Sequence, residues 1–360
     1  MGKEAEAFKA AVVGCRMGAA HADAIFALDG FELAALCDLN EETARVLAEK
    51  TGKPAVYTDY HRMLEEIRPE VVIVATPNKL HETMTLEAAA SGAKGIYCEK
   101  PMAVSLGEAQ RMVDACRKSG AALAIGHQRR MMPVFKTMRR LIREGVIGDV
   151  YLMRGVCPGD FLSDGTHTVD TLLWLNGDGN DAEWILGQVH REKPMEKKED
   201  NRSNRTGWRF GHPVETGAMA VVNFKNGVRA EIFTGDMRYP GWNLPHPGWA
   251  YQDIEVFGAG GRLWRGGDAA DPQLRIWDEK AGGWREVELD PNPEPDIFKY
   301  VFKEFASFIR GCGDFPLCAD KAIRGMEIVM AVYESARLHE KIWLPLKQER
   351  FPLEMMVERY

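Results

Sequence analysis

The sequence lacks the features of a secreted or membrane-bound protein. Its seven cysteines are odd in number and form no C-x-x-C pair, which is typical of a reducing compartment. No apolar stretch approaches the ~18–20 residues that span a bilayer. The N-terminal residues 1–6 are charged and contain no apolar signal core. We therefore expect a cytoplasmic protein with no membrane partner.

The chain also lacks an excess of positive charge. It has 46 Lys and Arg against 53 Asp and Glu, a formal net charge of −7. This balance argues against a nucleic-acid or anionic-membrane binder, which needs a basic surface. A local basic run is interpreted as one solvated helix face, with a phosphate site as the alternative; it comprises Lys136, Arg139, Arg140 and Arg143.

Several catalytic motifs are absent as well. His81-Glu82 lacks the second histidine of H-E-x-x-H, because residue 85 is threonine. The sequence contains no P-loop and no serine nucleophile elbow. We expect no metal site.

What the chain does contain is a repeated strand–helix alternation in its first third. Short apolar runs such as Phe8–Val13, Phe31–Cys37 and Val71–Ala75 alternate with amphipathic segments of helical length. Repeated βα units of this kind predict an α/β fold with a doubly wound parallel sheet. We predict that this domain spans residues 1–126.

The remaining residues, 127–360, predict a second domain of the α+β type. Asn226-Gly227 separates two strand-like runs and is a strong hairpin signal. Further strand-like runs follow, and two long helices are predicted near the end of the chain. We expect a large, open sheet that is mainly antiparallel or mixed. Residues 191–205 and 239–251 are expected to be loops.

A glycine-containing turn follows the first predicted strand. Gly14-Cys-Arg16-Met17-Gly18 opens the first helix, where backbone N–H groups favour a pyrophosphate. The turn is shorter than G-x-G-x-x-G and lacks the middle glycine, so a plain strand-to-helix turn is the alternative.

Asp38 ends the second strand at the distance expected for an acid that binds the adenosine ribose. Because its charge repels a 2′-phosphate, NAD is favoured over NADP; the alternative is an Asp that only initiates a turn.

Two further strands end in polar residues. Thr76-Pro77-Asn78 follows the run Val71–Ala75, with His81 a few residues later, and Asn78 alternatively caps a helix. Glu99-Lys100-Pro101 closes the apolar run that ends at Cys98. A lysine at the carboxyl end of a parallel strand points to the crevice where such sheets bind ligands. X-Pro bonds tolerate the cis form, so Pro101 is a candidate for one.

A second polar cluster lies between residues 160 and 170. His167 is flanked by Asp160, Asp164 and Asp170, and it shares a helix face with Asp170 if the helix has already begun. Neighbouring carboxylates make a histidine a better candidate acid or base, with a structural histidine as the alternative.

These motifs, taken in order, resemble those of the Gfo/Idh/MocA family, named for glucose–fructose oxidoreductase and inositol dehydrogenase. The resemblance covers nearly the whole chain and rests on Ala75-Thr-Pro-Asn78 with His81, Glu99-Lys-Pro101, Arg129-Arg-Met-Met-Pro133, Gly145-Val-Ile-Gly148, His167-Thr-Val-Asp170, Phe224-Lys-Asn-Gly227, Tyr333-Glu-Ser-Ala336 and Leu344-Pro345.

The resemblance implies a Rossmann domain and a second domain whose open sheet often makes oligomer contacts, so we expect a homodimer or homotetramer. It implies hydride transfer between NAD(P) and a hydroxyl carbon of a sugar, inositol or related polyol.

The resemblance also implies site residues. The family's catalytic lysine corresponds to Lys100 and its histidine to His167. The position of the family's frequent acid is occupied by Ser163. We therefore expect Asp164, three residues before His167, to be the third catalytic residue and to orient or charge His167. The predicted cofactor residues are Gly14, Arg16, Met17, Gly18, Asp38, Thr76, Pro77, Asn78, His81, Glu99 and Lys100; the predicted substrate residues are Arg154, Asp160, Tyr239, Trp242, His246 and Trp249.

Two other functions fit the same fold. In the first, transient oxidation of a sugar carbon allows elimination or glycoside cleavage, and the bound NAD is recycled with no net redox change. In the second, the protein is a non-catalytic regulator that senses a nucleotide. The presence of both Lys100 and His167 favours an enzyme, because a sensor needs neither.

Overall fold

The computed structural model describes residues 6–191, 207–238, 252–268, 270–279 and 281–357. The chain forms two compact units. The first comprises Met1–Ala103, Glu108–Met131 and Pro293–Ile323, and the second comprises Val104–Gly107, Met132–Asn292 and Arg324–Tyr360. The boundary predicted between residues 126 and 127 stays a prediction.

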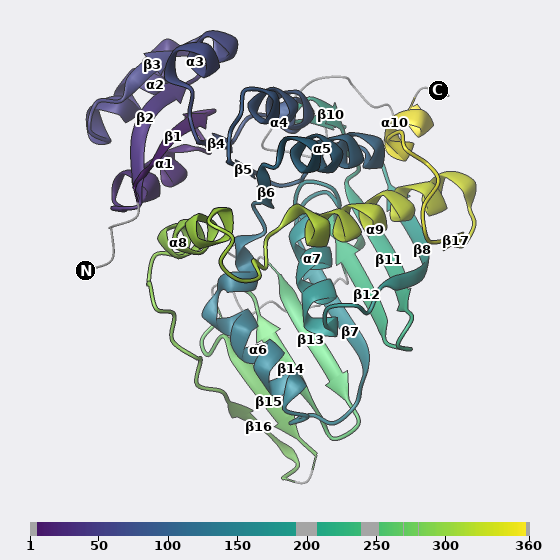
Figure 1. Ribbon diagram of the computed structural model, residues 1–360. Coiled ribbons are helices and arrows are strands. Elements are labelled where there is room, and N and C mark those ends of the chain that lie inside the picture. Colours follow the sequence, from purple (N-terminus) through teal and green to yellow (C-terminus); the bar gives the residue numbers. More distant parts are fainter. Residues whose placement is uncertain (1–5, 192–206, 239–251, 269, 280, 358–360) are drawn as a thin grey trace. The chain divides into compact units, whose positions relative to one another are not determined.

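The first unit contains the predicted parallel sheet, with strand order β3-β2-β1-β4-β5-β6 (Figure 1). All five strand pairs are parallel. The strand order reverses between β1 and β4, as in a doubly wound dinucleotide-binding sheet. The strands are β1 (Phe8–Val13), β2 (Phe31–Cys37), β3 (Ala55–Tyr57), β4 (Val71–Val74), β5 (Gly95–Cys98) and β6 (Ala122–Ile125).

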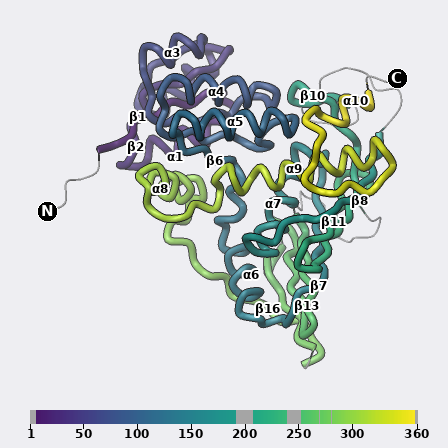
Figure 2. The backbone as a smooth tube through the Cα atoms, turned by 45° about the vertical axis from the view of Figure 1, so that its right-hand side comes forward, coloured from purple at the N-terminus to yellow at the C-terminus, as the bar shows by residue number. Residues whose placement is uncertain are grey.

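Helices separate these strands in sequence. They are α1 (Ala19–Phe26), α2 (Glu41–Lys50), α3 (Tyr60–Ile67), α4 (His81–Ala90) and α5 (Leu106–Ser119). Local capping sets some of their starts: Asn40 Oδ1 accepts a 3.1 Å hydrogen bond from Thr43 N at the start of α2. Helices α4 and α5 lie side by side in both views (Figures 1 and 2), and an ion pair between Arg111 and Glu82 joins them.

Helix α8 (Ile297–Ile309) belongs to the first unit, although it follows most of the second unit in sequence. Its N-cap residue is Asp296, whose side chain accepts hydrogen bonds from Phe298 N and Lys299 N. Its buried Phe302 packs against Tyr97 of β5, with ring centroids 5.1 Å apart. The core of the first unit is therefore completed by a late segment of the chain.

The second unit contains a nine-stranded mixed sheet with strand order β16-β15-β14-β13-β7-β12-β11-β8-β17. Among the described strands of this sheet, only β7 and β12 pair in parallel; the other pairs are antiparallel. This confirms the predicted α+β domain with a large mixed sheet. Its strands are β7 (Val150–Cys157), β8 (Ala182–His190), β11 (Gly217–Phe224), β12 (Arg229–Thr234), β13 (Asp253–Gly258), β14 (Gly261–Gly266), β15 (Leu274–Asp278), β16 (Gly283–Glu286) and β17 (Ile342–Trp343).

Two helices, α7 (Gly165–Asn176) and α9 (Ala319–Leu338), pack on one face of this sheet. Glycines permit the close approach: a Cβ at Gly155 would lie 2.4 Å from Thr168 of α7, and one at Gly187 would lie 2.8 Å from a side-chain carbon of Val332 of α9. Three short elements complete the unit, namely the β9 (Trp208–Arg209) and β10 (His212–Pro213) hairpin, α6 (Pro133–Arg143) and α10 (Pro352–Val357).

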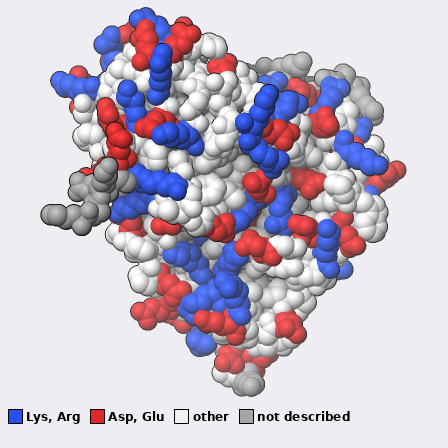
Figure 3. All heavy atoms as spheres, viewed as in Figure 1, with Lys and Arg blue, Asp and Glu red and all other residues white. Residues whose placement is uncertain are grey.

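Surface charges are mixed rather than segregated. Basic and acidic side chains are interspersed over the face shown in Figure 3. The basic run on α6 follows this pattern, because Arg139 pairs with Asp178 and Arg140 pairs with Asp290. Within the described part of the chain, no helix is both long and apolar enough to cross a membrane.

Candidate functional site

The turn after β1 brings two backbone segments unusually close together. Gly14 has a φ of 89°, and a Cβ at this position would lie 2.3 Å from the carbonyl oxygen of Ala75. A Cβ at Gly18 would lie 2.4 Å from the carbonyl oxygen of Gly14. Both positions therefore require glycine. Arg16 and Met17 between them are exposed, and the turn opens at the N-terminus of α1, where an anion is favoured.

Asp38 ties the end of β2 to this glycine turn. One carboxylate oxygen accepts a 2.7 Å hydrogen bond from Cys15 N, and the other accepts a 2.8 Å bond from Asn40 N. The hydrogen bond from Asn40 N closes a turn that begins at Asp38, and this is the alternative role considered for Asp38 in the sequence analysis. The same carboxylate therefore shapes both loops at the sheet edge and remains half-exposed beside them.

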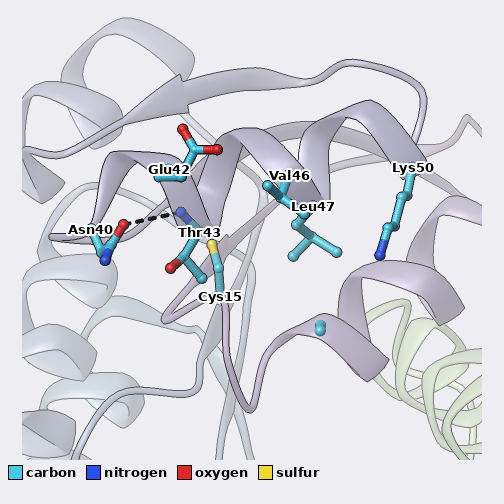
Figure 4. Close-up of a pocket in the computed structure, with 8 residues that line it drawn as sticks. Cys15, Asn40, Glu42, Thr43, Val46, Leu47 and Lys50 are labelled. Carbon is cyan, nitrogen blue, oxygen red and sulfur yellow. Dashed lines mark hydrogen bonds between the residues drawn. The ribbon is translucent and has the colours of Figure 1, made fainter.

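A hollow of about 380 Å³ lies next to Asp38, between the glycine turn and α2 (Figure 4). Cys15 and Ala19 contribute to it from the turn and α1. Along α2 and its cap, the lining residues are Asn40, Glu42, Thr43, Val46, Leu47 and Lys50. Figure 4 shows Asn40 and Lys50 at opposite ends of this row.

His81 is fully buried and joins the loops that follow β4 and β5. Its Nδ1 lies 2.8 Å from the Pro101 carbonyl oxygen, and its Nε2 lies 2.9 Å from that of Thr76. Burial lowers the pKa of the His81 imidazole, although the two carbonyl contacts oppose this shift. Both ring nitrogens thus contact the protein backbone, which fixes the two loops relative to each other.

Two neighbours of His81 have distinct environments. The Thr76 hydroxyl is buried and has no hydrogen-bond partner among the described residues. Asn78 is buried at the start of a short 3₁₀ turn, Asn78–Leu80. It does not cap α4, because the cap residue of that helix is Leu80.

Glu99 and Lys100 directly follow β5. The peptide bond between Lys100 and Pro101 is cis, as the sequence had suggested. The buried Glu99 carboxylate contacts His21 and accepts a hydrogen bond from Lys100 N. Burial raises the pKa of Glu99, but the hydrogen bond from His21 and the positive charges nearby outweigh burial and bring it below its ordinary value.

Four adjacent strands of the first unit therefore end in predicted site residues. In the order β2-β1-β4-β5, these residues are Asp38, Gly14, Thr76 and Lys100. Since the strands are parallel, all four residues lie at the same edge of the sheet. This is the edge at which open α/β sheets bind ligands.

In the second unit, α7 begins at Gly165, so the helix has already begun at His167. His167 therefore lies in the first turn of the helix, and it shares a face with Asp170 three residues later. Both side chains are buried. Asp164 occupies the cap position, and Gly159 makes room for its carboxylate, because a Cβ at Gly159 would overlap Asp164 Oδ2.

Arg209 links two of the predicted carboxylates. Its Nη1 lies 2.9 Å from Asp160 and 3.0 Å from Asp164. Asp160 is fully buried, and its other oxygen accepts a 2.6 Å hydrogen bond from Ser163 N. Arg209 is therefore part of the cluster that precedes His167. The sequence did not reveal it, because it lies more than 40 positions away along the chain.

A second set of buried groups holds the same loop. Glu215 accepts hydrogen bonds from Phe161 N and from the Tyr333 hydroxyl, and Leu162 N donates to that hydroxyl. Burial, together with the negative charge of Asp160, raises the pKa of Glu215 to about 8.

The predicted substrate residues are divided by the structure. Asp160 lies in the cluster just described. Arg154 lies on the sheet face opposite α7, where its Nε donates a 2.7 Å bond to Glu231, so it is not brought together with His167. The other four candidates, Tyr239, Trp242, His246 and Trp249, lie outside the described residues.

The strand order of the first sheet and the glycine turn after β1 define a doubly wound fold of the dinucleotide-binding type. Residues 8–127 match the model of the family described as an oxidoreductase family with an NAD-binding Rossmann fold. The resemblance to the Gfo/Idh/MocA family that the motifs indicated is thereby confirmed over these residues.

Curated relatives include myo-inositol 2-dehydrogenase from Thermotoga maritima. It is 26% identical over 262 residues, which cover 69% of this chain and 72% of the relative. D-glucoside 3-dehydrogenase from Escherichia coli is 36% identical over 132 residues, which are 37% of either chain.

Solved structures share the whole fold. The WlbA dehydrogenase from Bordetella pertussis, solved with NADH and UDP-GlcNAcA, is 23% identical with a TM-score of 0.74; the match covers 95% of this chain and 100% of that chain. Aldose-aldose oxidoreductase from Caulobacter crescentus is 20% identical with a TM-score of 0.76, covering 94% and 100%. At this identity the likeness shows the fold.

Proposed function

We propose that the protein is an NAD-dependent dehydrogenase that oxidises a hydroxyl carbon of a sugar, inositol or related polyol, or catalyses the reverse reduction. The observation that carries this proposal is the row of site residues after four adjacent parallel strands, with Lys100 at one end and Asp38 at the other. A lysine in this row is suited to bind the oxygen of a reacting hydroxyl.

The residues of the first unit fit a nicotinamide dinucleotide. Gly14 and Gly18 leave the backbone open to a pyrophosphate, and the unpartnered Thr76 hydroxyl adds a polar group at the same edge. Asp38 would bind the adenosine ribose. Glu42 in the first turn of α2 lines the hollow and adds negative charge beside it, which favours NAD over the 2′-phosphate of NADP. When bound, the dinucleotide supplies the two-electron acceptor.

Each catalytic side chain has a separate role in this proposal. Lys100 donates a hydrogen bond to the substrate oxygen and stabilises its developing negative charge. His167 accepts the hydroxyl proton as general base. Asp164 helps to fix the loop before His167, and its bond to Arg209 holds that carboxylate in place. The names of the inositol and glucoside dehydrogenases among the relatives support the substrate class.

The test is formation of NADH, followed by absorbance, across inositols, glucosides, aldoses, uronates and amino sugars. Turnover with at least one of them, faster with NAD than with NADP, is the expected result. Tight NAD binding without turnover across the panel would contradict the proposal and favour a nucleotide sensor. Protein that cleaves a glycoside without net NADH formation would favour the redox-neutral reaction.

We also propose that the chain self-associates through the open face of its large sheet. Cross-strand neighbours on this face form a row in which exposed Leu186 and half-buried Val221 adjoin oppositely charged side chains. The row continues through Glu231, Arg154, Glu255, Trp264, Arg275 and Glu286. An apolar patch beside alternating charges suits a self-complementary contact.

A further inference from the structure

His21 and Glu99 form a buried pair beneath the sheet edge that carries Lys100. His21 Nε2 lies 2.7 Å from Glu99 Oε1, and the two side chains are only 1% and 8% exposed. His21 belongs to α1, and Glu99 directly follows β5. The pair therefore joins the first helix of the unit to the strand end that precedes Lys100.

Glu99 also contacts the backbone of Lys100, so its carboxylate links His21 to this lysine. Its second oxygen, Oε2, accepts a 3.1 Å hydrogen bond from Lys100 N. The carboxylate fits against Gly126, where a Cβ would lie 3.1 Å from both carboxylate oxygens. Because both oxygens are engaged, Glu99 has one defined orientation, and its ionised form places a negative charge beside the lysine.

The orientation of His21 is fixed by aromatic packing. Its ring meets Tyr97, Phe298 and Phe302 edge-on, at centroid distances of 5.2, 4.7 and 5.7 Å. Its Nδ1 is buried and has no partner among the described residues, so Nε2 is the ring nitrogen whose proton is shared with Glu99. Nε2 thus donates the hydrogen bond to Glu99.

From these contacts we infer that His21, acting through Glu99, positions Lys100 for the proposed dehydrogenase chemistry. The inference rests on the proposed function for the role of Lys100, whereas the positioning itself stands on the contacts. A pair that only filled space would be easier to bury if it were apolar, because a buried carboxylate loses its hydration. Here the carboxylate is retained where it can act on the backbone and the charge of Lys100.

The experiment measures the reactivity of Lys100 without needing a substrate. The full chain is treated with a trace of acetic anhydride, and the acetylation rate of Lys100 is followed by peptide mass spectrometry relative to exposed Lys118. Glu99→Gln removes the charge with little change of shape, and His21→Phe removes the donor while keeping an aromatic ring. His21→Gln restores an N–H donor in the same place.

The chain provides matched controls in His61 and Glu87, a histidine–glutamate pair of the same unit. Their side chains are 74% and 28% exposed, and His61 Nε2 lies 3.6 Å from Glu87 Oε1. His61→Phe and Glu87→Gln therefore make the same substitutions as His21→Phe and Glu99→Gln, but in a pair that is much more exposed. Circular dichroism confirms that each variant is folded before labelling.

We expect Glu99→Gln and His21→Phe each to raise the acetylation rate of Lys100 about fivefold or more, because the hydrogen bond between Lys100 N and an oriented Glu99 carboxylate no longer holds this lysine in one place. His21→Gln should return the rate toward that of the parent protein, and both controls should leave it unchanged. Unchanged Lys100 reactivity in folded Glu99→Gln and His21→Phe would overturn the inference.

Turnover separates this inference from the proposed function. If a substrate is found, Glu99→Gln should lower kcat much more than it weakens NAD binding. If no substrate is found, the proposed function fails, and the acetylation rates still decide the positioning of Lys100.

Discussion

The Tyr333 hydroxyl donates a 2.8 Å hydrogen bond to the carboxylate of Glu215, joining α9 to the segment before β11. Both groups also hold the backbone of the loop before α7 through Phe161 and Leu162. Neither Tyr333 nor Glu215 is exposed. The loop that leads to His167 thus depends on a buried carboxyl group.

This arrangement predicts a dependence of stability on pH. The pKa of Glu215 is raised by burial and by the charge of Asp160 to about 8, whereas an unfolded Glu titrates near 4.3. The folded state therefore holds a proton that the unfolded state loses, and stability falls as pH rises between these values. One such proton changes the unfolding free energy by about 1.4 kcal/mol per pH unit.

Glu215→Gln should remove this slope, because its amide does not titrate. Urea unfolding at several pH values from 5 to 8 measures it, and Glu49→Gln on the exposed face of α2 is the control. A slope that is equally steep in the parent and in Glu215→Gln would show that Glu215 does not carry the effect.

Arg209 provides a second prediction. Arg209→Gln removes the cation from fully buried Asp160 as well as from Asp164, and it should lower the unfolding free energy by about 3 kcal/mol. Asp164→Asn should cost less, since the Arg209–Asp160 contact remains. Arg45→Gln breaks an exposed ion pair with Glu41 and should change stability by less than about 0.5 kcal/mol. Equal losses for Arg209→Gln and Arg45→Gln would refute the role of the cluster.

Gly14 and Gly92 allow steric contact to be separated from backbone strain. Both have φ near 90°, but a Cβ at Gly92 meets nothing within 4 Å, whereas one at Gly14 overlaps the Ala75 carbonyl oxygen. Each change to Ala should cost about 1 kcal/mol from the left-handed conformation. Gly14→Ala should cost about 2 kcal/mol more from the overlap and should weaken NAD binding, as measured by calorimetry. Similar NAD affinities for the two variants would contradict the assignment of the turn to the cofactor.

Val221 tests the proposed self-association. It lies on the open sheet face beside Leu186, away from the face packed by α7 and α9. Val221→Lys should convert an oligomer to monomers in light-scattering measurements, because an uncompensated charge would be buried in the contact. Val146→Lys, at an exposed site of the same unit, should leave the mass unchanged. A monomeric parent protein would exclude the proposed surface outright.

The sequence predicted the first unit well because its signals are local. Continuous apolar runs such as Val71–Val74 are buried on both faces of a parallel sheet, and the strand ends follow directly from them. The start of α7 could not be placed from the sequence, because it lacks such a signal. Its first turn contains the polar residues Thr166, His167 and Thr168, which tertiary packing buries, so no apolar periodicity marks them.

The contacts that complete the site residues could not be predicted, because they join distant parts of the chain. Glu99 meets His21 across 78 positions, and Arg209 meets Asp160 across 49. A buried histidine in α1 and an arginine in a short hairpin carry no periodic or motif signal. Only the fold brings them to the groups they hold.

The proposed dehydrogenase chemistry depends on Lys100, and a comparison of four proteins tests its role. NADH formation and NAD affinity are measured in parallel for the parent protein, Lys100→Ala, His167→Ala and the exposed control Lys118→Ala. We expect turnover to fall by roughly 10²–10⁴-fold in each of the first two variants, with NAD affinity nearly preserved, while Lys118→Ala behaves like the parent. Unchanged turnover in both Lys100→Ala and His167→Ala would contradict the proposed chemistry.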